Sequence, residues 1–259
     1  MKKRYRIMFP ASSSSTLEQD EVFFSLIENG EVHRLRFHDY SDIYKRPGLY
    51  EQIFYDRLKC NSPAKVSDLL KRALDTVREP LNELRVLDLG AGNGMMGEML
   101  KRDGVARLVG ADIIPEARDA AYRDRSEVYD DYYVADFERL DSDTADELAD
   151  WSFDCLTCVA ALGFGDIPPR AFFNAMKFVR TDGWLAFNIK VTFLDHTENT
   201  GFSRLVRELI FSKYLDVYHL ELYRHRLSME GTQLFYYALV GRMTASIPET
   251  FLEEHGIED

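Results

Sequence analysis

Apolar runs and amphipathic stretches alternate along the chain between residues 84 and 190. The apolar runs have the length and composition of buried strands, and the segments between them carry apolar residues at helical spacing. Alternation of this kind predicts a mostly parallel sheet covered by helices on both faces. The predicted strands are 84–89, 106–112, 130–135, 153–159 and 183–190, and the predicted helices are 93–103, 115–124, 144–151 and 168–180.

Polar and apolar positions also predict elements on both sides of this segment. Asn29-Gly30 separates two strand-like runs and is a strong signal for a β-hairpin, because a type I′ turn needs positive φ at both central positions. Ser62 as N-cap and Pro63 at the first helical position predict a helix that ends near residue 78. The remaining predicted elements are strands at 21–28 and 31–37, a helix at 201–215, antiparallel strands at 217–227 and 233–243, and a loose tail from residue 247.

These patterns predict an α/β fold: a doubly wound, seven-stranded, mostly parallel sheet with an antiparallel C-terminal strand pair, plus an N-terminal β-hairpin and helical cap. We divide the chain into a cap or lid at residues 1–80 and a main domain at residues 81–259. The 259 residues, 46% of them hydrophobic, are enough for one α/β domain with an appended element.

Net charge and cysteine content limit the cellular environment and the binding partners that we expect. A formal net charge of −12 disfavours nucleic acid, since affinity for phosphates comes mainly from cations. The basic start is followed by too short an apolar run for a signal peptide, and no run approaches the roughly 20 residues that span a bilayer, so we expect a soluble, cytoplasmic protein without a membrane partner. Cys155 and Cys158 lie three apart on a predicted strand, where they point to opposite faces, so we predict core packing and no metal site.

Residues 86–100 read as a buried strand, a glycine-rich turn and an amphipathic helix. From Gly92 to Gly97 the letters match the dinucleotide pattern GxGxxG, which is typical of nicotinamide-dependent oxidoreductases. Counted from Gly90, the residue directly after the strand, the spacing is instead GxGxG. Asp88 precedes Gly90 by two residues, and its charge would repel phosphates and favour a ligand with a positive amino group.

Two further acids follow the next two predicted strands. Asp112, 22 residues after Gly90, is suited to accept two hydrogen bonds from a ribose diol. Asp136 is suited to accept from an exocyclic amine such as adenine N6, and Phe137 to flank the ring.

The motifs VLDLGAGNG, LVGADI, YYVADFERL, FDCLTCVAALGFGDIPP and DGWLAFNIK, in this order, resemble those of class I S-adenosylmethionine (SAM)-dependent methyltransferases over about residues 80–245. The resemblance implies SAM as cofactor and S-adenosylhomocysteine (SAH) as product, with the acceptor and the sulfonium facing residues 160–166. It implies that the glycine loop backs the methionine and sugar, the first acid holds the ribose and the second recognises adenine. The implied cofactor-binding residues are Gly90, Ala91, Gly92 and Gly94, then Asp112 with Ile113 beside it, then Asp136 with Phe137, in addition to Asp88.

For the acceptor we expect a small molecule that receives the methyl group on oxygen or nitrogen by in-line displacement. The segment after the fourth strand lacks the Asn/Asp-Pro-Pro-aromatic signature of amino-methyltransferases, and the tyrosine-rich segment 38–55, with Tyr44, is suited to roof a half-buried ligand. His196 and His225 are the candidate general bases, and Asp166 is a candidate substrate contact or helix cap. A SAM-fold binding protein without turnover is the third hypothesis, beside the methyltransferase and the oxidoreductase.

Overall fold

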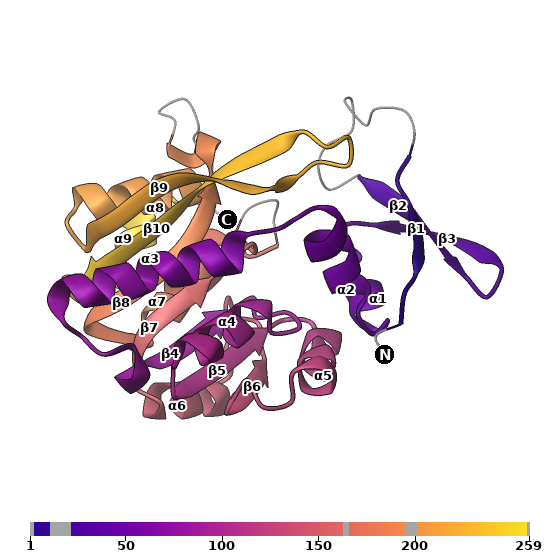
Figure 1. The fold of residues 1–259 in the computed structure, drawn as a ribbon. Coiled ribbons are helices and arrows are strands. Elements are labelled where there is room, and N and C mark those ends of the chain that lie inside the picture. Colours follow the sequence, from indigo (N-terminus) through magenta and orange to yellow (C-terminus); the bar gives the residue numbers. More distant parts are fainter. Residues whose placement is uncertain (1–2, 11–21, 163–165, 195–200, 258–259) are drawn as a thin grey trace.

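The structure is a computed structural model that describes residues 3–10, 22–162, 166–194 and 201–257. It contains a large sheet flanked by helices and a small three-stranded sheet beyond one end of it (Figure 1). The predicted α/β class, with an N-terminal hairpin attached to the main fold, is confirmed.

The large sheet has seven strands, as predicted. Those from β4 to β8 pair in parallel, whereas β10 pairs antiparallel with β8 on one side and β9 on the other. In spatial order the strands are β6 (Asp131–Val134), β5 (Arg107–Asp112), β4 (Arg85–Leu89), β7 (Phe153–Cys158), β8 (Val179–Lys190), β10 (Gln233–Met243) and β9 (Leu215–Leu227).

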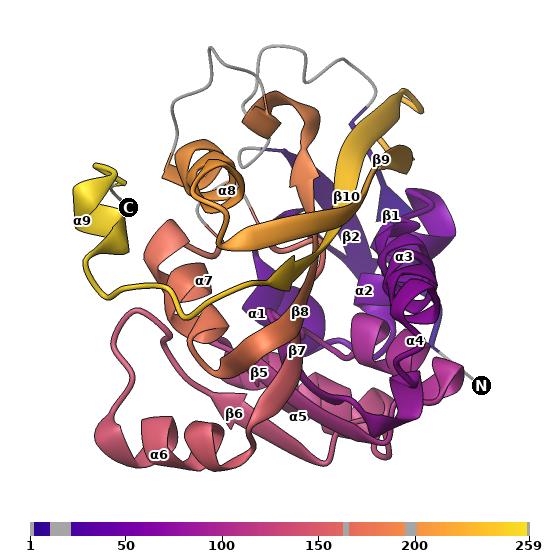
Figure 2. The ribbon, with the colours of Figure 1, turned by 90° about the vertical axis from the view of Figure 1, so that its left-hand side faces the viewer.

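Helices cover both faces of the sheet and bury one hydrophobic cluster on each (Figure 2). The central strands are rich in apolar residues because both of their faces are covered. Cys155 and Cys158 illustrate this, since both are fully buried in β7 but belong to opposite clusters, as predicted. The helices are α3 (Ser62–Val77), α4 (Met95–Asp103) and α5 (Pro115–Asp124) on one face, and α6 (Ser142–Asp150), α7 (Pro169–Met176) and α8 (Gly201–Phe211) on the other.

The small sheet contains the predicted hairpin and a third strand that the sequence pattern did not indicate. Asn29 and Gly30 have φ of 53° and 85°, the positive values that the turn requires. Three short helical segments follow the hairpin and share its core. These elements are β1 (Arg6–Met8), β2 (Phe23–Glu28), β3 (Glu31–Arg36), α1 (Tyr40–Tyr44), α2 (Leu49–Glu51) and the π-helix η1 (Gln52–Arg57).

The β9–β10 hairpin reaches from the large sheet to the N-terminal elements (Figure 1). The Leu227 amide donates to the Leu58 carbonyl at 2.6 Å, and the Asn61 amide donates to the His225 carbonyl at 2.9 Å. These two bonds hold the C-terminal strands against the segment that links η1 to α3.

Several predicted boundaries are wrong. The helix predicted at 168–180 ends at Met176, because Val179 already pairs with Phe153 of β7 and starts β8. Asp166 does not cap this helix, whose N-cap is Pro168 and makes no side-chain cap bond. The helix predicted at 201–215 ends at Phe211.

Two shorter corrections concern α3 and the C-terminus. Ser62 is the first residue of α3 instead of its cap, which is Asn61. The tail predicted to be loose contains a short helix, α9 (Phe251–Glu254), whose Phe251 ring stacks on Phe173 of α7 at 6.2 Å. A single turn with two buried apolar residues is too short to give a periodic pattern. Two short 3₁₀ turns complete the described elements: η2 (Leu81–Glu83) and η3 (Val191–Leu194).

Candidate functional site

A cavity opens at the carboxyl ends of the parallel strands, beneath the tyrosine-rich segment. It encloses about 1010 Å³, part of it open to solvent. Crevices at the carboxyl ends of parallel strands are the usual ligand sites of open α/β sheets. Four segments of the main fold form its walls: residues 89–93 of the glycine loop with Met95 and Met96, residues 112–114 after β5, residues 135–138 after β6, and residues 159–161 and 166–168 after β7.

The glycine loop approaches the rest of the wall too closely for side chains. Gly90 and Gly92 have φ of 66° and 55°, and both line the cavity together with Ala91. A Cβ on Gly90 would lie 2.7 Å from the Ala161 Cβ, and one on Gly92 would lie 2.5 Å from the Tyr44 hydroxyl oxygen. Both positions therefore need glycine, for conformation and for space.

Gly94 does not line the cavity, although the resemblance implies that it binds cofactor. It is the N-cap of α4 with φ of 88°, and a Cβ there would meet Arg125 and Tyr129 at 3.2 Å. Its position supports the start of the helix instead of a ligand.

Asp88 also stands behind the cavity wall instead of in it. Its side chain is 1% exposed, and its two oxygens accept hydrogen bonds from the Tyr129 and Thr157 hydroxyls, both at 2.7 Å. Burial raises the pKa of Asp88 to about 6, against the opposing effect of these two bonds. Asp88 therefore lies in a buried hydrogen-bond network behind the cavity wall, and its preference for a ligand with a positive amino group stays a prediction.

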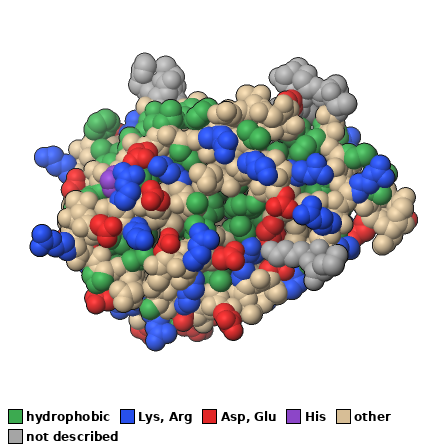
Figure 3. Space-filling view, in the orientation of Figure 1, with side chains coloured by type: hydrophobic (Ala, Val, Ile, Leu, Met, Phe, Trp, Pro, Cys, Tyr) green, Lys and Arg blue, Asp and Glu red, His purple; other side chains and the backbone are tan. Residues whose placement is uncertain are grey.

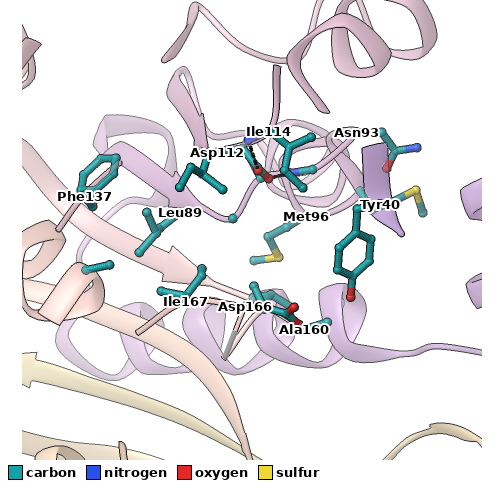
Figure 4. Close-up of a pocket in the computed structure, with 18 of the residues that line it drawn as sticks. Tyr40, Leu89, Asn93, Met96, Asp112, Ile114, Phe137, Ala160, Asp166 and Ile167 are labelled. Carbon is teal, nitrogen blue, oxygen red and sulfur yellow. Dashed lines mark hydrogen bonds between the residues drawn. The ribbon is translucent and has the colours of Figure 1, made fainter. Parts of the chain in front are cut away.

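Asp112 lies in the wall, at the end of β5 (Figure 4). Its carboxylate accepts from the Gly92 and Ile114 amides, each at 3.0 Å, which fixes its orientation and ties it to the glycine loop. Each oxygen keeps a further lone pair for a ligand. Burial raises the pKa of Asp112 to about 6. The adjacent Ile113 also lines the cavity and is 58% exposed.

Asp136 and Phe137 mark one end of the cavity. Asp136 accepts from the Glu138 amide at 2.9 Å, and Phe137 is nearly buried with its ring edge-on to Phe178. Figure 4 shows Phe137 at one end and Tyr40 at the other, with Asp112 and Met96 between them.

The tyrosine-rich segment lines the same cavity, with Tyr40, Tyr44, Tyr50 and Tyr55 all in its wall. The rings contact one another in series, with centroids 6.1 Å apart for Tyr40 and Tyr44 and 5.2 Å apart for Tyr44 and Tyr50. Burial raises the pKa of each of these phenols, so all four are neutral at physiological pH.

Arg125 joins the N-terminal elements to the glycine loop. Its guanidinium is 6% exposed and pairs with Glu51 of α2 at 3.0 Å and with Glu98 of α4 at 2.9 Å. It also donates to the Asn93 carbonyl at 3.0 Å. The nearly buried guanidinium of Arg125 therefore fixes the tyrosine-rich segment relative to the glycine loop.

Replacing Arg125 with methionine should lower the free energy of unfolding by about 3 kcal/mol, because it leaves Glu51 buried without its partner. Urea denaturation of the two proteins measures this difference. Arg118→Met is the matched control, since Arg118 is 42% exposed and its one ion pair within the described ranges is with its neighbour Asp119, a surface pair worth about 0–1 kcal/mol. Equal losses in the two variants would contradict the tethering role.

A second cavity of about 570 Å³ adjoins the first. The two share five wall residues: Tyr40, Tyr50, Ala160, Ala161 and Asp166. The second cavity extends from this shared wall toward the β9–β10 hairpin and is lined there by His225, Arg226 and Tyr236.

His225, a candidate general base, lies in the second cavity but is not arranged as a base. Ser62 Oγ accepts hydrogen bonds from the Tyr223 hydroxyl and the Cys60 thiol. The serine hydroxyl therefore donates its own proton to His225 Nδ1, at 2.6 Å, and the imidazole carries its proton on Nε2. Burial, aided by the charge of Arg226, lowers the pKa of His225 to about 3. His225 is thus a neutral hydrogen-bond donor. His196, the other candidate, lies outside the described residues.

His38 and Asp166 form a pair that sequence reasoning missed. His38 Nδ1 lies 2.9 Å from Asp166 Oδ1, and both residues line the second cavity, with Asp166 also in the wall of the first. Because an ionised carboxylate only accepts hydrogen bonds, Nδ1 of His38 is the donor to Asp166. A sequence signal existed for Asp166, which falls in the segment that the resemblance places at the sulfonium.

Asn93 is a second residue that sequence reasoning missed. It lines the first cavity and is 1% exposed, yet its Oδ1 has no hydrogen-bond partner among the described residues. A buried acceptor of this kind is costly without a donor, and an ammonium group of a ligand would supply one.

Neither a metal-binding cluster nor a membrane-spanning helix is found in the described part of the chain. No group of three or more His, Cys, Asp or Glu side chains is arranged there to hold a metal ion. None of the helices in the described ranges is long and apolar enough to cross a membrane.

Comparison with known proteins identifies the core of the fold. Residues 87–187 match the family model described as a methyltransferase domain. No curated protein gives a significant match. Among solved structures, a protein of Thermoplasma acidophilum is 18% identical with a TM-score of 0.50, over 70% of this chain and 86% of that one.

Two other solved structures carry descriptions of activity. A protein of Pyrococcus horikoshii, provisionally described as an RNA methyltransferase, is 13% identical with a TM-score of 0.51, over 71% of this chain and 84% of that one. Magnesium protoporphyrin IX methyltransferase from Synechocystis PCC 6803, solved with bound SAM, is 13% identical with a TM-score of 0.49, over 70% of this chain and 79% of that one. At 18% and 13% identity, the likeness to the Thermoplasma acidophilum and Pyrococcus horikoshii proteins concerns the fold alone.

Proposed function

We propose that this chain, which contains a class I SAM-dependent methyltransferase domain, transfers the methyl group of SAM to a small-molecule acceptor. The observation that carries the proposal is the shared wall between the two cavities. A sulfonium held in the first cavity near Ala160 and Asp166 would face a ligand in the second. Residues 1–80 would act as the cap that closes both.

SAM would lie along the first cavity with its adenine next to Phe137 and its methyl group toward Tyr40. The Asp112 carboxylate would accept from both ribose hydroxyls, and Asp136 from the adenine amine. The backbone of residues 90–92 would lie against the methionine and sugar, and the unpartnered Asn93 Oδ1 would accept from the ammonium group. Tyr44 would cover the loop at Gly92.

Methyl transfer from SAM requires no dedicated covalent chemistry from the protein. SAM supplies an activated methyl group, and the chain aligns the acceptor with it and excludes water. A hydroxyl acceptor loses its proton as the new O–C bond forms and the C–S bond breaks. His38, which donates its Nδ1 proton to Asp166, would take the proton of the acceptor hydroxyl on Nε2.

The charge of the chain supports a small acceptor instead of a nucleic acid. The net charge is −12, and Figure 3 shows basic and acidic side chains interspersed over the face that it displays. A polyanion would gain little from such a surface. The three cysteines are free thiols, which supports a cytoplasmic location.

Calorimetric titration with SAH, NAD and NADP tests the proposal against the oxidoreductase alternative. We expect heat of binding from SAH and none from either dinucleotide. Binding of NAD or NADP without binding of SAH would refute the proposal. Tight SAH binding without methyl transfer to any acceptor in a broad metabolite screen would favour a binding protein without turnover.

A further inference from the structure

An irregularity in β9 turns Arg226 toward the second cavity. Arg224 pairs with Phe235 and Arg226 pairs with Leu234, so His225 is an extra residue opposite one peptide of β10. This is a β-bulge, which places consecutive side chains on the same side of a strand and often re-aims one of them beside a site. His225 and Arg226 accordingly line the second cavity together.

The Arg226 guanidinium has no anionic partner in the described part of the chain. The residue is partly buried, and its one hydrogen bond there is from Nη1 to the Leu227 carbonyl at 3.0 Å. No carboxylate of the described residues lies within 4.0 Å of it, whereas its charge is felt by Tyr40, Cys60 and His225 around the cavity. Partial burial of an unpaired cation is costly, so its position indicates an anion supplied by a ligand.

The rest of the second cavity defines what such a ligand looks like. Aromatic rings form much of its wall: Phe37, Tyr40, Tyr50, Phe54 and Tyr236. Asp166, the carboxylate of this cavity, is paired with His38 at the wall shared with the first cavity, whereas Arg226 lines only the second. The second cavity thus combines aromatic walls with a cation, Arg226, that is not part of the wall shared with the first cavity.

We infer that the second cavity binds an aromatic carboxylate as methyl acceptor, with the carboxylate on Arg226 and the hydroxyl directed toward His38 and the methyl group. The planar guanidinium fork matches a carboxylate in a bidentate pair. This inference rests on the proposed function, because it takes the first cavity to be occupied by the methyl donor.

The test compares 4-hydroxybenzoate with 4-hydroxybenzamide, its uncharged counterpart of nearly the same shape, in titrations of the SAH-saturated protein. We expect the carboxylate to bind about tenfold more tightly or better. Arg226→Met should reduce the affinity for the carboxylate to that for the amide and leave SAH affinity unchanged. Arg224→Met is the matched control, since Arg224 is exposed, lies two residues away and lines neither cavity.

The outcomes separate this inference from the proposed function. Equal binding of the two probes, binding of neither at about 5 mM, or the same loss in Arg224→Met as in Arg226→Met would overturn the assignment of Arg226. Failure of the wild-type protein to bind SAH would instead refute the proposed function itself.

Discussion

Replacing Asp112 with alanine should weaken SAH binding by about 1.5–3 kcal/mol, or roughly 10- to 150-fold in Kd. The Gly92 and Ile114 amides already hold the Asp112 carboxylate in one orientation. Its remaining lone pairs can therefore accept from a ribose diol without a further loss of side-chain entropy. The substitution removes the ribose bonds and also the bond that ties β5 to the glycine loop. Calorimetric titration of both proteins with SAH measures the effect.

Asp119→Ala is the control for this change, because Asp119 lies on α5 with its side chain 68% exposed. It should bind SAH as the wild type does. If Asp112→Ala keeps wild-type affinity while its thermal unfolding is also unchanged, Asp112 does not hold the ribose.

SAH affinity should also depend on pH through Asp112. Its pKa in the free protein is raised to about 6 by burial, and the ribose hydroxyls donate best to the ionised form. SAH binding therefore lowers the pKa of Asp112. The affinity for SAH is highest above pH 6 and falls by up to about tenfold for each pH unit below 6. Titrations between pH 5 and 8 should show this slope in the wild type and a flat profile in Asp112→Asn.

Replacing His38 with glutamine should lower kcat for a hydroxyl acceptor by about 10²- to 10⁴-fold. Glutamine keeps a hydrogen bond to Asp166 but has no basic nitrogen for the acceptor proton. SAH affinity should stay unchanged, because His38 lines only the second cavity. SAH released from SAM, measured with an acceptor found by the probe titrations, gives kcat and KM separately.

Two further variants serve as comparisons for the effect of His38→Gln on kcat. His33 lies on β3 of the small sheet and lines neither cavity, so His33→Gln should keep wild-type kcat. Asp166→Asn should lower kcat less than His38→Gln does, as expected for a positioning residue. A wild-type kcat in His38→Gln would show that the acceptor loses its proton by another route.

The fold was predictable because its signals are local. Apolar runs separated by amphipathic segments specify buried parallel strands and their covering helices, and Asn29-Gly30 specifies the hairpin turn. Asp112 and Asp136 follow the ends of adjacent parallel strands, so placing them at one edge of the sheet needed no knowledge of distant contacts.

The side-chain partners that the sequence did not reveal depend on contacts between distant parts of the chain. Both oxygens of Asp88 accept hydrogen bonds from Tyr129 and Thr157, which lie 41 and 69 residues away. His38 gains its role only from Asp166, which is 128 residues away. Arg226 faces the second cavity only because β9 bulges against β10, and no periodic pattern records a single inserted residue.

A crystal structure of the protein with bound SAH would show whether the first cavity holds the methyl donor as proposed. We expect adenine beside Phe137, both ribose hydroxyls on the Asp112 carboxylate, and the sulfur at the wall shared by the two cavities, next to Ala160 and Asp166. SAH bound elsewhere, or bound with its sulfur directed away from the second cavity, would refute the proposed arrangement.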